Sequence, residues 1–193
     1  SIVRQLLGVG ADGQHRLTVA TNTGRYEVSD DVGCDWTKAA TLVQAARARS
    51  DGDAVELLRS ALELVGGRIA SDADRSFAWL SDDHEVYGRI ERTMVDAAER
   101  LGELALAGGD YDLARWAADR GLAVVPGQEA LLRMQMRAAA MAGDSQGVID
   151  AYRVAVAAAE ELGPWSEVQP ETGALLRELL DHRSSPGCIV NRR

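Results

Sequence analysis

Histidines are the side chains best suited to acid–base or metal chemistry, and the three in this chain, His15, His84 and His182, stand in different segments away from both cysteines. Only His84 has carboxylates beside it, in the stretch SDDHEVYGRIE, a set that could ligate a cation. Acidic residues at a helix start are also favoured by the helix dipole, and we prefer that interpretation. We therefore expect no metal site.

The glycine-containing stretches do not fit a cofactor loop. VGADG and GGDYD lack the spacing of a dinucleotide-binding or phosphate-binding loop, and no serine stands in a nucleophile elbow. The sequence predicts neither a catalytic residue nor a bound cofactor, so we do not expect an enzyme.

Composition points to a helical, acidic protein. The 193 residues are 46% apolar and only 5% aromatic, with abundant alanine, which favours helices over sheets. The net charge of −9 opposes binding to phosphate backbones, although a small basic element at one end remains compatible with it. No apolar run reaches about 18 residues and no signal peptide is present, so we expect a cytoplasmic chain without membrane contact. The first residue is not methionine, and we expect the chain to be part of a longer protein.

The two cysteines, Cys34 and Cys188, fit neither a zinc spacing nor a disulfide framework. Two reduced thiols are the interpretation we favour. A bridge between them stays open, because spacing alone does not establish that they are close.

Hydrophobic periodicity predicts a chain of helices. Apolar residues at steps of three and four favour helices after Asp35, after Asp53 and from Pro170, and over residues 90–108, 111–125, 131–141 and 148–162. Residues 66–82 are expected to form a loop held by an aromatic side chain. A single β-hairpin is predicted near the beginning, where alternating residues flank the polar stretch TNTG: Leu17, Val19, Tyr26 and Val28.

The helices recur at a fixed period. Gly109-Asp110 returns as Gly143-Asp144, 34 residues later, which is the spacing of tetratricopeptide repeats. The first unit has small or apolar residues where that pattern requires them, whereas Gln135, Met136 and Val148 depart from it in the second: Leu101, Gly102, Ala114, Gly121 and Pro126 match. Repeats of this kind stack, because no single hairpin can bury its own apolar face. We expect a mainly α fold of antiparallel helical hairpins in a right-handed superhelical stack, with one small N-terminal β-hairpin.

The order of segments resembles a known family. A divergent hairpin from Asp35 to Gly67, a loop with Trp79, two tetratricopeptide-like units and the run AYR…EELG before a last helix resemble the bacterial transcriptional activator domain. The resemblance covers about residues 35–182. It implies a regulatory domain that works through protein–protein contact, followed here by a flexible tail at residues 183–193.

In that family the helical domain follows a winged-helix DNA-binding domain. SIVRQLLG and the hairpin from Arg16 to Val28 resemble its last helix and its wing, so residues 1–34 are interpreted as the end of such a domain. The resemblance implies DNA contacts by Ser1, Arg4, Gln5, Arg16 and Arg25. The earlier helices of a winged helix are absent from this sequence, and residues 1–35 carry more acidic than basic side chains. DNA binding is therefore expected only through a complete winged helix that this chain does not contain, and simple packing is the competing interpretation.

A partner surface is implied by the repeats. In tetratricopeptide arrays the first helix of each unit lines a concave groove, which here places an acidic strip beside a basic one: Asp96, Glu99 and Glu103, then Arg133 and Arg137. Such a groove suits a mixed-charge peptide or a neighbouring domain, and self-association through the repeats is a further expectation. A solvated face with internal ion pairs is the competing interpretation.

We therefore expect the interaction domain of a bacterial transcriptional regulator, acting in dimerisation, inter-domain packing or recruitment. The alternatives are a non-transcriptional scaffold or envelope-associated signalling adaptor that binds a peptide or domain in the groove, and a fragment of an enzyme whose active site lies elsewhere.

Overall fold

The computed structural model describes residues 2–19, 24–64, 66–67 and 84–184. The chain divides into two compact units, Ser1–Lys38 and Ala39–Arg193, each of which is treated by itself. The described residues form eight helices and two short strands, which confirms the mainly α fold with one N-terminal β-hairpin. In order they are α1 Ile2–Leu7, β1 Leu17–Val19, β2 Tyr26–Val28, α2 Asp35–Ala46, α3 Asp51–Glu63, α5 His84–Gly108, α6 Tyr111–Val124, α7 Glu129–Met141, α8 Ser145–Leu162 and α9 Pro170–Ser184.

The first unit contains the predicted hairpin. Strands β1 and β2 are antiparallel, with Leu17 opposite Val28 and Val19 opposite Tyr26. Leu17 is buried, whereas every residue of β2 is exposed. Two strands alone are marginal in water, and helix α1 contacts β1 to supply the missing support. The TNTG turn lies largely outside the described residues.

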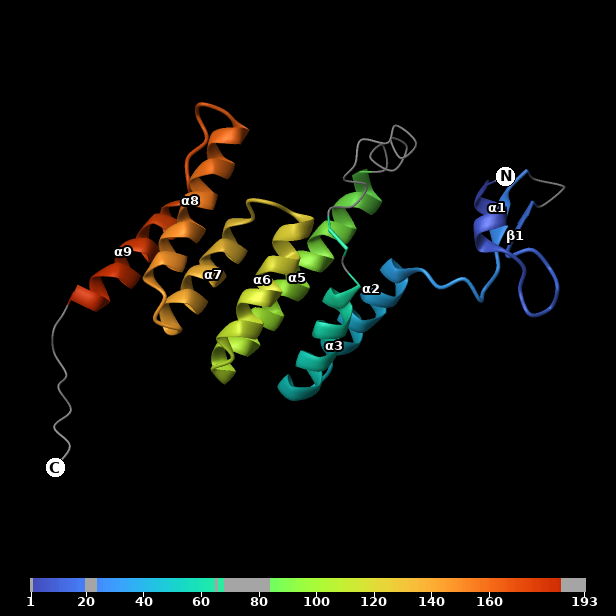
Figure 1. The fold of residues 1–193 in the computed structure, drawn as a ribbon, viewed down its shortest axis with the longest axis horizontal. Coiled ribbons are helices and arrows are strands. Elements are labelled where there is room, and N and C mark those ends of the chain that lie inside the picture. Colours follow the sequence, from blue (N-terminus) through green and yellow to red (C-terminus); the bar gives the residue numbers. More distant parts are fainter. Residues whose placement is uncertain (1, 20–23, 65, 68–83, 185–193) are drawn as a thin grey trace. The chain divides into compact units, whose positions relative to one another are not determined.

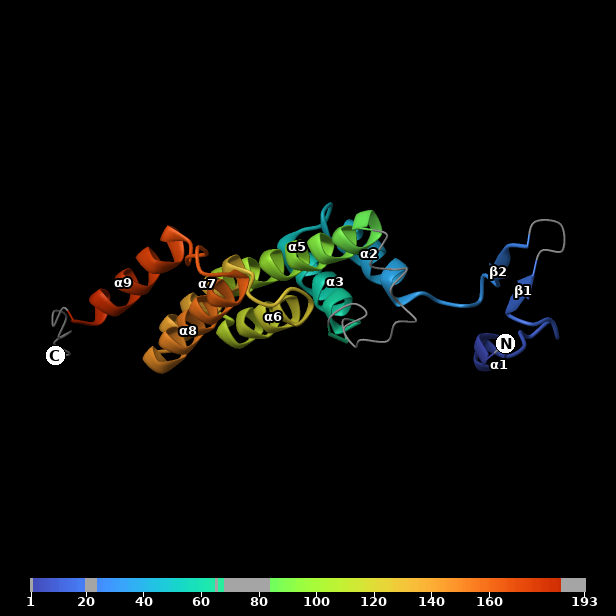
Figure 2. The ribbon, with the colours of Figure 1, turned by 90° about the horizontal axis from the view of Figure 1, so that it is seen from above.

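The second unit is a stack of helices that pack in sequence order. Helix α6 packs on α5, α7 on α6 and α8 on α7, while α7 also contacts α5 and α9 (Figure 1). Figure 2 shows the consequence: α5, α7 and α9 lie along one side of this stack and α6 and α8 along the other. The first helices of successive hairpins therefore form one layer, as helical repeats require.

The two Gly-Asp turns have the same structure, as the 34-residue period predicted. Gly109 and Gly143 adopt left-handed φ values of 78° and 84°, which glycine tolerates without strain. The next residue caps the following helix in both cases. Asp110 accepts a hydrogen bond from the backbone N–H of Leu113 at 3.0 Å, and Asp144 accepts one from Gly147 at 2.9 Å.

Small residues permit close approaches between helices. A Cβ added to Gly102 of α5 would lie 1.8 Å from the sulfur of Met134 on α7. One added to Gly121 of α6 would lie 2.5 Å from Leu131 and 2.8 Å from Ala98. A Cβ at either position would therefore force neighbouring side chains to shift. Space, and not backbone conformation, favours glycine there, since no left-handed φ is found at either residue.

Helix α3 joins the stack through packing and one polar contact. It packs on α5 and α6, and the guanidinium of Arg120 on α6 donates a hydrogen bond to the carbonyl of Leu62 near the end of α3, at 3.2 Å. The same guanidinium lies 6.0 Å from the ring centre of Trp116, one turn earlier. Arg120 thus ties the divergent hairpin to the first repeat.

Some predicted boundaries need correction. Asp53 was expected to cap the second helix, but α3 begins at Asp51 and its N-cap residue is Ser50, without a side-chain capping bond. Two acidic residues in the first turn favour this earlier start through the helix dipole. Most of the expected aromatic loop, residues 68–82 with Trp79, and most of the expected tail, residues 185–193, lie outside the described residues.

Candidate interaction face on the first helices of the repeats

The acidic strip predicted on α5 occupies one face of that helix. Asp96, Glu99 and Glu103 follow at steps of three and four; Asp96 and Glu103 are exposed, and Glu99 is partly buried. Burial raises the pKa of the Glu99 carboxyl above its ordinary value, and the charges of Asp96 and Glu103 act in the same direction. The strip is therefore a locally crowded set of negative charges.

Residues from outside α5 moderate that crowding. A hydrogen bond from the Gln128 side chain and the charge of Arg133 both lower the pKa of Glu99, against the larger effect of burial. Gln128 is the N-cap residue of α7, and Arg133 lies within α7. The structure thus brings the acidic strip of α5 and one residue of the basic strip of α7 into a common environment.

Arg133 also has a structural task that its sequence position did not reveal. Its guanidinium donates hydrogen bonds to the Gln169 side-chain oxygen and to the Thr172 hydroxyl, both at 2.9 Å. Glu129, one turn earlier on α7, accepts hydrogen bonds from the backbone N–H of Gln169, at 3.0 Å to each oxygen, and from the Thr172 hydroxyl. We call these four residues, Glu129, Arg133, Gln169 and Thr172, the α9 clamp.

The clamp fixes the start of α9 against α7. Thr172 is fully buried, and its hydroxyl both donates to Glu129 and accepts from Arg133. A buried hydroxyl without partners would cost about 1–3 kcal/mol, so these contacts are needed for burial. The basic residue of this face that stands exposed is Arg137, one turn beyond Arg133.

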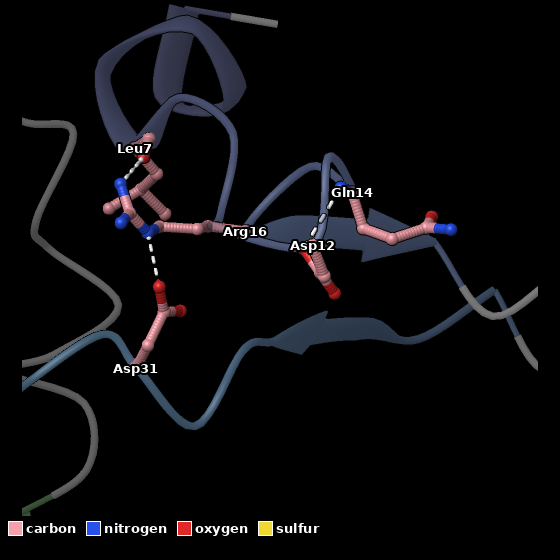
Figure 3. A network of polar contacts seen from close by, with 5 residues as sticks. All are labelled: Leu7, Asp12, Gln14, Arg16 and Asp31. Carbon is pink, nitrogen blue, oxygen red and sulfur yellow. Dashed lines mark hydrogen bonds and ion pairs between the residues drawn. The ribbon is translucent and has the colours of Figure 1, made fainter.

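The first unit is organised around Arg16, as Figure 3 shows. Its guanidinium donates to the carbonyl of Leu7, the last residue of α1, at 3.2 Å, and to a carboxylate oxygen of Asp31 at 2.7 Å. The side chain of Ser29 and then Arg16, through their hydrogen bonds, hold the pKa of Asp31 below its ordinary value. Arg16 thus connects the helix, the hairpin and the segment after it.

The residues predicted to contact DNA differ in how exposed they are and in whether they take part in the contacts of Arg16. Arg4 and Gln5 are exposed on α1, and Arg25 is exposed just before β2. Arg16 is only partly exposed and is engaged in the contacts just described. Ser1 lies outside the described residues.

Other candidate chemistry finds no support in the part of the chain that the structure describes. Within residues 2–19, 24–64, 66–67 and 84–184, no group of three or more potential metal ligands comes together. None of the helices described there is both long and apolar enough to cross a membrane. Cys34 is an exposed free thiol, whereas Cys188 lies outside the described residues.

Comparison with protein families identifies the class. The family model of the bacterial transcriptional activator domain matches residues 34–180, most of the helical repeats and the hairpin before them. The chain belongs to this family, which is a regulatory domain family of bacterial transcriptional regulators and not an enzyme family. The match confirms the resemblance read from the sequence. No curated protein and no solved structure matches the chain.

The clamp residues Glu129, Gln169 and Thr172 were missed by sequence reasoning. Glu129 looks like an ordinary acidic residue in a first helical turn, and Thr172 like an ordinary polar one. Their pairing joins positions about 40 residues apart, and no periodic pattern marks it. Only the packing of α9 on α7 brings them together.

Proposed function

We propose that the repeats are the protein-contact part of a bacterial transcriptional regulator, acting in dimerisation, inter-domain packing or recruitment. The observation that carries the proposal is the common layer of α5, α7 and α9. Its charged side chains, Asp96 and Glu103 on α5 and Arg137 on α7, remain exposed after the structural pairs have formed. A face with separate acidic and basic parts favours a partner that places basic residues opposite the acidic part and acidic residues opposite the basic part.

DNA reading, in this proposal, belongs to a winged-helix domain of which residues 1–34 are the end. The succession of α1 and an antiparallel hairpin supports this interpretation, as do the exposed side chains of Arg4 and Arg25. Arg16 is assigned a structural role there instead of a direct DNA contact, because it links α1 to Asp31. A regulator of transcription works where the chromosome lies, so we place the chain in the cytoplasm.

Charge reversal on the face tests the proposal. We would compare the double variant Asp96→Lys/Glu103→Lys and the single variant Arg137→Glu with matched reversals on α6 and α8, Asp112→Lys and Arg153→Glu. Asp112 and Arg153 are exposed on the helices of the other layer. Arg133 is left unchanged, because its reversal would break the α9 clamp.

Two assays distinguish dimerisation from recruitment. Sedimentation velocity measures self-association, and a reporter gene measures recruitment when the chain is fused to a DNA-binding domain with a known operator. We expect the α5 and α7 variants to lower one of the two readings and the control variants to leave both unchanged. Equal behaviour of all variants in both assays would overturn dimerisation and recruitment through this face.

DNA binding is tested by fluorescence anisotropy with mixed-sequence duplex DNA over a salt titration. The chain would be compared with a version extended to a complete winged helix. Binding by the extended version alone, weakening steeply as salt rises, is the expected result, since phosphate contacts release counterions. Absence of binding by both would favour the scaffold or adaptor alternative.

A further inference from the structure

The loop between α8 and α9 carries the most exposed large apolar side chains of the described residues. Trp165 is 95% exposed and Leu162, at the end of α8, is 82% exposed. The loop turns at Gly163, whose φ is 130°, and Ser166 donates a backbone hydrogen bond to the Gly163 carbonyl at 3.1 Å. Contact with water is unfavourable for an indole of this size, and a buried Trp is a common anchor in interfaces.

The chain segment around this pair carries only acidic charges, and the nearby Arg133 is engaged in the α9 clamp. Glu160, Glu161, Glu167 and Glu171 are all exposed. From Val154 to Leu176 the sequence contains these four acidic residues and no Lys or Arg, so this segment has a net charge of −4. We call Leu162, Trp165 and the four glutamates the loop patch.

The loop is held at both ends, which lowers the cost of ordering it in a complex. One end continues from α8, and at the other end the backbone N–H of Gln169 is bound by the Glu129 carboxylate of the α9 clamp. A segment already ordered at both ends loses less conformational freedom on binding than a free one. Figure 1 shows this loop beyond the end of α8, at the opposite end of that hairpin from the α7–α8 turn.

We propose that the loop patch is a docking site for a basic protein segment that provides an apolar pocket for Trp165. The acidic rim selects positive charge and repels phosphate backbones and anionic lipid headgroups. A second copy of the chain is disfavoured, because a symmetric contact would place two acidic rims together in a chain that already carries −9. A basic partner protein is the occupant that satisfies both the rim and the apolar centre.

This inference goes beyond the proposed function, because it assigns a second contact surface outside the layer face of α5 and α7. The two can fail separately. Charge reversal at Asp96, Glu103 or Arg137 should leave binding to the loop patch unchanged, and substitutions in the loop patch should leave the readings of the layer face unchanged.

The test is a selection from a library of random 16-residue peptides displayed on phage, with the whole chain as the target. Parallel selections would use the variant Trp165→Ala and the matched control Met141→Ala. Met141, the last residue of α7, is also exposed, at 61%, and lies by the α7–α8 turn. Thermal melting of the three proteins establishes that the fold is unchanged.

We expect peptides that are enriched on the original chain and on Met141→Ala, but not on Trp165→Ala, and that carry net positive charge together with apolar residues. Synthesised copies of these peptides should bind Trp165→Ala about 10-fold or more weakly, as for an anchor residue of an interface. They should also bind Glu160→Lys/Glu161→Lys more weakly, with a loss that shrinks as salt rises.

Three results would overturn the proposal. The first is a selection in which no peptide depends on Trp165, or in which the dependent peptides are not basic. The second is a dimer in sedimentation that Trp165→Ala converts to a monomer, which would make a second copy the occupant. The third is binding of the chain to vesicles of anionic lipid that Trp165→Ala abolishes, which would make a membrane surface the occupant.

Discussion

The two repeats share a turn and differ in what their first helices meet. In both, a left-handed glycine and a capping aspartate join the helices with the same hydrogen bonds. Gly102 of α5, however, lets Met134 of α7 come close, whereas the residue 34 positions later, Met136, is a fully buried side chain in one apolar cluster with Leu175 of α9. The turn depends only on residues near it in the sequence and can therefore be repeated. The contact residues of each first helix differ, because each helix packs on a different neighbour.

The second repeat also has a set of hydrogen bonds around a buried hydroxyl group. Between α5 and α7, Gly102 permits the close approach of Met134, and the Gln128 side chain at the start of α7 donates a hydrogen bond to Glu99. Where α9 is the neighbour, the clamp from Glu129 and Arg133 adds hydrogen bonds around the buried Thr172. These hydrogen bonds fix the start of α9 against α7, in addition to the apolar contact of Leu175 with Met136.

The largest expected loss of stability follows from a substitution at Gly102, where α5 and α7 approach closely. We expect Gly102→Leu to destabilise the chain by about 3 kcal/mol, because any Cβ there collides with the Met134 side chain. The measurement is thermal or urea-induced unfolding. Gly108→Ala is the control, since a Cβ on that helical residue meets no atom within 4 Å and should be neutral or slightly stabilising. A Gly102→Leu protein that unfolds like the original would show that α5 and α7 are not held as described.

The clamp should give the next largest effect. Glu129→Ala removes the acceptor for the Gln169 N–H and the buried Thr172 hydroxyl, at a cost of about 1–3 kcal/mol. Hydrogen exchange should become faster in α9 while α5 and α6 remain protected, because the loss is local. Glu129→Gln keeps an acceptor oxygen and should lose less. Uniform loss of protection over all helices would contradict a clamp confined to α9.

Substitutions of the capping aspartate should have a smaller effect on stability, and one of equal size in the two turns. Asp110→Ala and Asp144→Ala should each cost about 1 kcal/mol, because each removes one side-chain cap of a helix start. Asn at either position keeps the acceptor and should restore most of the loss. Clearly unequal costs in unfolding experiments would mean that the two turns are equivalent in geometry but not in energy.

The smallest expected effect concerns Glu99 and its dependence on pH. The pKa of Glu99 in the folded chain lies above its ordinary value of 4.5, so the folded state holds the proton more tightly than the unfolded state. Ionisation therefore lowers stability as pH rises through that window. Glu99→Gln should raise the melting temperature near neutral pH and lose this advantage below about pH 4, where both states are protonated. A gain that does not change with pH would point to packing and not to charge.

Much of the helical stack could be predicted because its signals are local. The period of Gly109-Asp110 and Gly143-Asp144, together with apolar residues at steps of three and four, indicated both repeats before any packing was known. Pro170 likewise marked the start of α9, since proline suits the first position of a helix. The start of α3 was placed too late, because Asp51 and Asp53 are both suitable for a first turn and the pattern does not choose between them.

The candidate face was only partly predictable. Positions on α5 and α7 followed from helical spacing, but spacing does not say which charges are already paired. Arg133 and Arg137 are one turn apart and look alike in the sequence, yet Arg133 binds Gln169 and Thr172 while Arg137 stays exposed. Arg16 was likewise grouped with Arg4 and Arg25 until its bonds to Leu7 and Asp31 separated it from them.

By itself the sequence determined the helices, the repeated turn and the membership of a regulatory family, because turns, caps and periodicity depend on residues a few positions apart. The tertiary structure decided which charged side chains hold the fold and which remain exposed. That distinction depends on neighbours about 40 residues away, as in the pairing of Glu129 with Thr172. A charged residue looks the same in the sequence whether or not such a neighbour lies beside it in the fold.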